Sequence, residues 1–178
     1  RDDAAEIIEA EGLTVTPGLI DMHMHVESSM ITPAAYAQAV LPRGVTTVQW
    51  DPHEFANVHG LDGVTWALEA AADLPLRMIV LAPSCVPAAP GLEMSGADFG
   101  GAELADMLAR PGIGGVAEVM NMRGVIDRTA PMRDVVQAGL ESGKPVFGHA
   151  RSLAGADLNA FMAAGVSSDQ GGGQRRRQ

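Results

Sequence analysis

Two histidines two residues apart are the first feature of this 178-residue chain that could do chemistry. His23 and His25 lie in the mostly apolar stretch 19–26, which follows a Pro-Gly pair. On a β-strand, residues i and i+2 point to the same face, so the two imidazoles would lie side by side at the end of a strand. That placement indicates a metal site. The ordinary alternative is a pair of histidines held by hydrogen bonds.

A glutamate and a third histidine complete the set of candidate metal ligands. Glu118 lies in the apolar run 113–119, where burial of a carboxylate is costly unless a ligand or an ion pair stabilises it. His149 follows the short run 145–148. Imidazole nitrogen and carboxylate oxygen suit zinc, manganese or iron(II), and a carboxylate can bridge two cations about 3.5–4 Å apart. Such a pair lowers the pKa of a bound water from about 15.7 to about 7, as hydrolysis at neutral pH requires.

Further polar residues follow the predicted strands and are candidates for the substrate pocket or for support of the metal ligands. They are Asp51, His53, Glu54, Ser84 and Asp169. Residues 51–54 could also ligate metal themselves, or could form a simple turn in which Asp51 caps and Pro52 sets the direction. Cys85 reads as a small packed side chain rather than a nucleophile, and a single cysteine excludes an internal disulfide or a cysteine-rich zinc site.

The elements that must position these residues alternate between strand and helix. Apolar and β-branched runs predict strands, whereas helical apolar spacing, Thr-Pro starts and glycine stops predict helices. The predicted strands are 19–25, 45–50, 74–81, 113–119, 145–149 and a sixth beginning at 166; the predicted helices are 33–41, 61–72, 102–109, 131–141 and 155–164. Residues 6–15 predict two short strand fragments around a turn at Glu11-Gly12.

Strand and helix in alternation predict parallel strands with helical crossovers, in either an open sheet or a barrel. Every candidate residue comes at the carboxyl end of a strand, where parallel α/β folds gather their functional groups. Six consecutive strands that each deliver a polar group to one rim favour a barrel. The chain also lacks a Gly-x-Gly-x-x-Gly after its first strand, which argues against a dinucleotide-binding sheet.

Charge and hydropathy exclude several classes of protein. The net charge of -10 and the pI near 4.8 argue against nucleic-acid binding, because phosphate-backbone binders carry clustered cationic faces. No apolar run reaches the roughly 18 residues that cross a bilayer, so no membrane association is expected. The chain begins Arg1-Asp2-Asp3 without an initiator Met or a signal-peptide layout, which predicts a chain that either starts mid-protein or was cut, with a cytoplasmic location as the default.

Several motifs in order resemble one family. Residues 17–25, Pro-Gly-Leu-Ile-Asp-Met-His-Met-His, resemble the metal-binding first strand of the amidohydrolase superfamily. The segments 27–30, 51–58, 81–88, 118–121 and 148–150 are similar to those of the bacterial adenine deaminases, and the resemblance extends over about residues 13–169. The first motif alone indicates only the superfamily, whereas the combination is specific.

The resemblance implies an α/β fold, the (β/α)8 TIM-type barrel, with a binuclear divalent metal centre that hydrolyses adenine to hypoxanthine and ammonia. Manganese or iron(II) are the expected metals, with zinc as the alternative. The family's His-x-His pair falls on His23 and His25, its bridging and catalytic carboxylate on Glu118, and its strand-five histidine on His149. Activated water would attack C6 of the purine while an acid protonates the leaving amine. A homo-oligomer is expected for the full-length form.

The chain also departs from the family. Family members continue from Ser168-Asp169 into a His-Glu pair, whereas this chain has Gln170 and a Gly- and Arg-rich end. We therefore expect three parts: 1–16 as a remnant of an N-terminal β-sheet domain, 17–169 as a barrel truncated to about six βα units, and 170–178 as an atypical tail. The alternatives are an amidohydrolase acting on a cyclic amide, or a fragment that binds metal without turnover.

Overall fold

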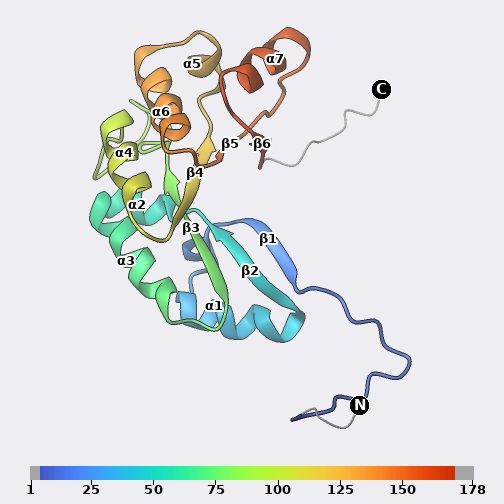
Figure 1. Ribbon diagram of the computed structural model, residues 1–178. Helices are drawn as coiled ribbons and strands as arrows, with labels where there is room; N and C mark the ends of the chain where they lie inside the picture. The colour runs from blue at the N-terminus through green and yellow to red at the C-terminus, as the bar shows by residue number, and fades with distance from the viewer. Residues whose placement is uncertain (1–4, 171–178) are drawn as a thin grey trace.

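Six parallel strands form one sheet whose spatial order follows the chain order (Figure 1). The computed structural model describes residues 5–170. The strands are β1 (Leu19–Met24), β2 (Val45–Trp50), β3 (Arg77–Pro83), β4 (Ile113–Val119), β5 (Val146–Gly148) and β6 (Ser168–Asp169). Each strand pairs with the next in parallel and the order never reverses. That succession is a partial barrel, which confirms the predicted architecture over a doubly wound open sheet.

Helices connect the strands and cover the outer face of the sheet. They are η1 (Val26–Ser29), α1 (Pro33–Val40), η2 (Leu41–Arg43), α2 (His53–His59), α3 (Leu61–Ala72), α4 (Gly101–Ala109), α5 (Met122–Ile126), α6 (Ala130–Glu141) and α7 (Gly155–Ala163). The first crossover shows how the sequence sets the ends of its elements. Thr32 caps α1 by accepting a hydrogen bond from Ala35 N–H at 3.2 Å, and Gly44 ends the unit in the left-handed region with φ of 89°.

Two apolar layers lie on opposite faces of the sheet. The larger one packs between the strands and the helices and includes Val80, Val116 and Val146. The smaller one, on the face toward the barrel interior, consists of Leu81, Ala117 and Phe147, with Ile79 against it. In β3, β4 and β5 these adjacent residues thus alternate between the layers, as the period of two requires.

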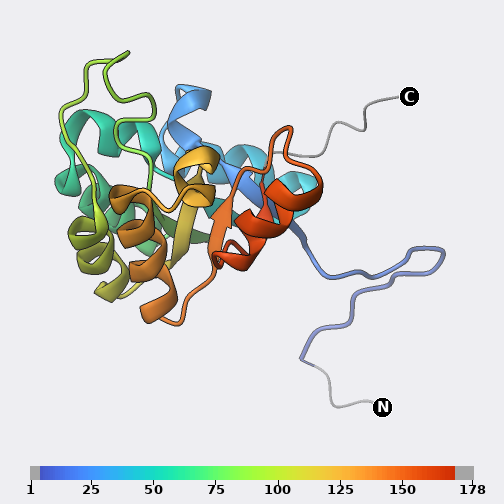
Figure 2. The same ribbon diagram turned by 90° about the horizontal axis from the view of Figure 1, so that it is seen from above.

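The predicted pair of strand fragments in residues 6–15 is wrong. The turn at Glu11-Gly12 is present, with Leu13 N–H donating to the Ala10 carbonyl at 3.0 Å, but the structure assigns no strand between residues 5 and 18. The segment leaves the sheet as an extended arm (Figure 1, Figure 2), and Ile8 and Val15 are over 80% exposed. An isolated two-stranded hairpin is marginal in water without a third strand or a helix to pack on.

Besides the 3-10 turns η1 and η2, two short α-helices lie outside the predicted set. α2 begins at His53, immediately after β2, and α5 begins at Met122, immediately after β4. Both are shorter than eight residues, too short for apolar spacing to reveal a helix. The predicted domain limits stay a prediction, and all but the first residue of the expected tail, 170–178, lies outside the described residues. Among residues 5–170, no helix has the length and apolar character to cross a membrane.

Candidate metal centre

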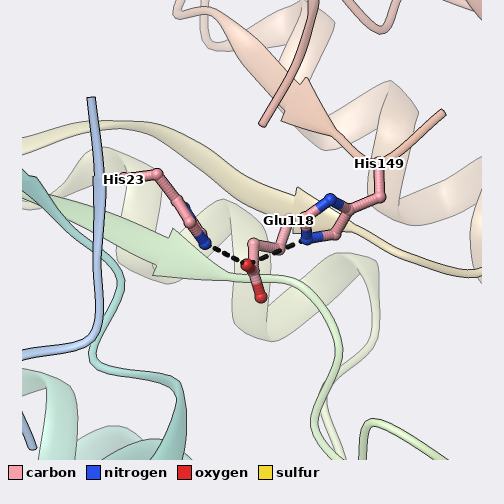
Figure 3. A group of neighbouring side chains, drawn as sticks. All are labelled: His23, Glu118 and His149. Carbon is pink, nitrogen blue, oxygen red and sulfur yellow. Dashed lines mark hydrogen bonds and ion pairs between the residues drawn. The ribbon is translucent and has the colours of Figure 1, made fainter. Parts of the chain in front are cut away.

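Three imidazoles converge on one carboxylate oxygen at the carboxyl ends of the strands. Nε2 of His23, His149 and His25 lie 2.6, 3.0 and 3.2 Å from Oε1 of Glu118. Figure 3 shows His23 and His149 reaching the carboxylate from two different sides. His23 comes from β1, His25 directly follows it, Glu118 belongs to β4 and His149 follows β5. The structure thus brings together the four residues predicted as metal ligands.

Glu118 points to the barrel interior because β4 contains a bulge. Val116 and Val119 both pack in the layer against the helices, and Ala117 packs in the inner layer. Strict alternation would send residue 118 outward, but β4 has one more residue than β5 between its Val116 and Val119 pairings. The backbone of Glu118 absorbs the change with φ of 35°. A non-glycine residue in this region costs of order 1–3 kcal/mol, so the surrounding structure must hold it there.

The charges of the centre stabilise one another. Burial alone would raise the pKa of the Glu118 carboxyl, but hydrogen bonds from His23, His25 and His149 hold it below its usual range. Burial of the His25 ring favours its neutral form, yet hydrogen bonds to Glu118 and Glu54 outweigh burial and raise its pKa to about 11. An ionised Glu118 beside a protonated His25 is therefore the favoured charge state of this pair near neutral pH in the metal-free chain.

The second nitrogen of His25 has its own partners, which orient the ring. Nδ1 lies 2.9 Å from the carbonyl oxygen of Asp51 and 3.4 Å from Oε2 of Glu54. When Nδ1–H donates to these oxygens, Nε2 is left as the ligating atom, as in carboxylate–histidine–metal arrangements. Burial would raise the pKa of Glu54, but the hydrogen bond from His25 lowers it to about 2.

Glu27 also belongs to this network, although sequence reasoning gave it no role. Trp50 Nε1–H donates to one of its oxygens at 2.7 Å and the backbone N–H of Glu54 donates to the other at 3.2 Å. Burial and the neighbouring Glu54 raise its pKa to about 7. Its position two residues after His25 continues the spacing of the histidine pair, and that was the available signal.

Asp51 and His53 lie beside the cluster and bring buried polar atoms to it. Asp51 is 1% exposed, and among residues 5–170 neither carboxylate oxygen has a hydrogen-bond partner. Burial, together with the charge of Glu118, raises the pKa of Asp51 well above its ordinary value. The His53 ring centroid lies 6.3 Å from that of His25, and burial lowers the pKa of His53 so that its ring is neutral at pH 7.

The donor set fits divalent cations. Candidate ligand atoms of His23, Glu118 and His149 lie within 4.8 Å of one another, and so do those of His25, Asp51 and Glu118. Ligands about 2.0–2.2 Å from one ion lie at most about 4.4 Å apart, so small movements suffice. Glu118 is common to both groups, as a bridging carboxylate must be, and the unpartnered oxygens of Asp51 are buried acceptors that a bound cation would satisfy.

The two remaining predicted residues lie at the edges of the centre. The hydroxyl of Ser84 donates to the carbonyl oxygen of Ala117 at 2.6 Å, so it supports the backbone of β4. Asp169 accepts a hydrogen bond from the backbone N–H of Ala150 at 3.1 Å, next to His149. Cys85 is buried as predicted, and burial raises its thiol pKa. It nevertheless makes hydrogen bonds, which the reading as an apolar side chain missed.

Comparison with known proteins places these residues in a family. The chain is 73% identical over 169 residues to "adenine deaminase 2" of Rhizobium etli and 56% identical over 169 residues to "adenine deaminase" of Klebsiella pneumoniae; each match covers 95% of this chain and 28% of the relative. The "adenine deaminase" of Methanothrix thermoacetophila is 45% identical over 166 residues, 93% of this chain and 29% of its own. The chain therefore spans less than a third of these relatives. The model of the amidohydrolase family matches residues 14–171, and the chain belongs to the amidohydrolase family.

Proposed function

We propose that this chain carries the metal-binding part of an adenine deaminase, which hydrolyses adenine to hypoxanthine and ammonia. The observation that supports this most directly is the convergence of three imidazole Nε2 atoms on Glu118, within a chain 73% identical to a relative of that name. A cyclic amide as substrate and a non-catalytic metal-binding role are the outcomes against which the proposal is tested.

The expected cofactor is a pair of divalent cations, manganese or iron(II) before zinc. His23, His25, Glu118 and His149 would hold it, with Glu118 shared between the two groups of donors. When bound, the pair lowers the pKa of a water held in the site toward about 7.

The chain's own residues would do the remaining work. Glu118 stays ionised because hydrogen bonds from the surrounding rings lower its pKa, and it balances the positive charge of the centre. Glu54 fixes the orientation of His25. The neutral ring of His53 lies at the edge of the cluster, where it can exchange a proton with the purine. We also propose a cytoplasmic location and a homo-oligomeric full-length form.

The test is ammonia release from adenine by the purified chain loaded with Mn²⁺ or Fe²⁺ in separate samples. In parallel, residues 5–170 would replace the matching segment of the Rhizobium etli relative, since the chain covers 28% of that protein. We expect the chimera to release ammonia from adenine. His149→Ala should abolish release, because it removes a donor 3.0 Å from Glu118, while His59→Ala, at the exposed end of α2, should leave it intact.

The outcomes separate the three readings. Hydrolysis of a cyclic amide such as dihydroorotate or hydantoin, with none of adenine, would replace the proposed substrate class. A chimera that binds metal but acts on neither compound would support the non-catalytic reading. An inactive chimera beside an active parent relative would contradict the proposal for this chain.

A further inference from the structure

Two adjacent side chains after β3 hold the backbone on both sides of the Glu118 bulge. The hydroxyl of Ser84 donates to the carbonyl of Ala117 at 2.6 Å, and the thiol of Cys85 donates to the carbonyl of Glu118 at 3.0 Å. The Cys85 sulfur in turn accepts the backbone N–H of Met120 at 3.3 Å. Three consecutive peptide groups around residue 118 are thus bound by side chains of one neighbouring loop.

These contacts occur where regular pairing of β4 is interrupted. A bulge leaves ladder groups without their usual partners, and buried carbonyl and N–H groups must find others. Ser84 and Cys85 are 5% and 7% exposed, so water is largely excluded from their contacts with β4. The backbone of Glu118 can keep its φ of 35° because the peptide groups before and after this residue are both held by side-chain hydrogen bonds.

The carboxylate depends on that backbone conformation for its direction. The side chain of Glu118 points inward because the bulge interrupts the regular alternation of side chains in β4. All three imidazoles contact the same oxygen of this side chain. A shift of the peptide would move Oε1 away from all of them together. A small loss of order at the bulge therefore translates into a loss of several ligand contacts.

We propose that Ser84 and Cys85 are positioning residues, whose hydrogen bonds hold the bulged backbone of β4 so that Glu118 faces the metal ligands. The inference rests on the metal centre of the proposed function, but not on adenine as the substrate. It replaces the reading of Cys85 as a merely packed side chain.

The test compares Mn²⁺ binding by the purified chain and its variants, measured from the free Mn²⁺ signal in electron paramagnetic resonance. Cys85→Ala and Cys85→Ser leave spaces of nearly equal size, but only serine can donate and accept. We expect the alanine variant to bind Mn²⁺ about 10- to 100-fold more weakly than the parent, the range for loss of groups that orient ligands. The serine variant should retain clearly tighter binding than the alanine variant.

If Cys85 only filled space, the alanine variant should bind Mn²⁺ more tightly than the serine variant, because an apolar site tolerates alanine better than a buried hydroxyl. Val64→Ala is the matched control. It truncates a fully buried residue of α3 in the layer against the helices, and should lower stability to urea while leaving Mn²⁺ affinity near that of the parent. Equal Mn²⁺ affinities for parent, Cys85→Ala and Cys85→Ser would overturn the proposal.

Ser84→Ala keeps the test decisive if Cys85→Ala does not fold. It removes a single donor, and it should weaken Mn²⁺ binding and speed hydrogen exchange near Met120 more than Val64→Ala does. Unchanged binding and exchange in Ser84→Ala would refute the role of Ser84. Weaker Mn²⁺ binding in these variants, in a protein that leaves adenine untouched, would uphold this inference while the proposed substrate fails.

Discussion

Replacing Glu118 by glutamine should remove most of the pH dependence of stability that the metal-free chain shows just above neutrality. Glutamine keeps the shape of the side chain and one acceptor oxygen but loses the charge. The charge matters because His25, with a pKa of about 11 in the folded chain, has an ordinary pKa of 6.5. Above pH 6.5 the folded chain therefore holds a proton that the unfolded chain releases.

The sign and the size follow from proton linkage. Because the folded state binds more protons, the free energy of unfolding falls as pH rises, by about 1.4 kcal/mol per pH unit for one proton. The contribution is complete below pH 6.5 and is lost as pH approaches 11. From pH 7.5 to 9 the parent should lose about 2 kcal/mol from this residue. The range from pH 7.5 to 9 lies above the pKa of Glu27, about 7, so that carboxyl contributes little to the change in the free energy of unfolding over this range.

Glu118→Gln should flatten this dependence and lower stability at pH 7 by about 3 kcal/mol, the lower end for breaking a buried ion pair. The lower end applies because the His23 side chain keeps 26% exposure and the His25 side chain 20%. Urea unfolding in EDTA at pH 7.5, 8, 8.5 and 9 measures the slope, and proton NMR of the ring of His25 measures its pKa directly. Glu69→Gln makes the same chemical change on the exposed face of α3 and should alter neither quantity.

An unchanged slope in Glu118→Gln would refute this reasoning, because hydrogen bonding to Glu118 is the largest influence that raises the pKa of His25. A His25 that titrates near 6.5 in the parent chain would refute it equally. In that case the ring of His25 would be neutral beside Glu118, and its position would depend on packing rather than on charge.

Two further predictions concern the support of the centre. Glu54→Gln should make acid unfolding less steep, since the pKa of Glu54 is lowered from 4.5 to about 2 and its stabilisation is present above pH 4.5 and lost as pH falls toward 2. Glu54 is about half exposed, so the substitution should lower the free energy of unfolding by less than about 1 kcal/mol. Acid titrations followed by circular dichroism measure this loss, and a larger one would contradict the placement of the side chain. Phe161→Ala should cost about 3–5 kcal/mol in urea unfolding, because a fully buried aromatic ring of α7 is removed beside Gly148. A cost near that of an exposed substitution such as Met162→Ala would show that α7 does not pack on β5 as described.

The rim of the barrel could be predicted from sequence because it follows from strand order alone. His23, Glu118 and His149 each end or follow an apolar run, and parallel strands bring such positions to one edge. The inward direction of Glu118 could not be derived in this way. It depends on an extra residue of β4 relative to β5, and register between strands of different crossovers leaves no local pattern.

The supporting residues show a similar limit. Asp51 and Glu54 are candidates from sequence, but their contacts with His25 are not readable there. Asp51 meets His25 through its backbone carbonyl, and Glu54 meets it from α2, a helix with too few turns to predict. Cys85 was read as packed because hydrogen bonds from a thiol depend on what lies across the sheet. Those contacts are tertiary, so one segment read by itself does not contain them.

The bulge in β4 makes the centre intolerant of a deletion that the sheet itself would accept. Removing one residue between Val116 and Val119 would match β4 to β5 residue for residue and relieve the unfavourable backbone of Glu118. Deleting Glu118 would remove the carboxylate on which the imidazoles meet, and deleting Ala117 would leave Glu118 facing inward but remove the peptide carbonyl that Ser84 binds. A regular strand and a rim whose backbone is held by Ser84 and Cys85 thus make opposite demands on the length of β4.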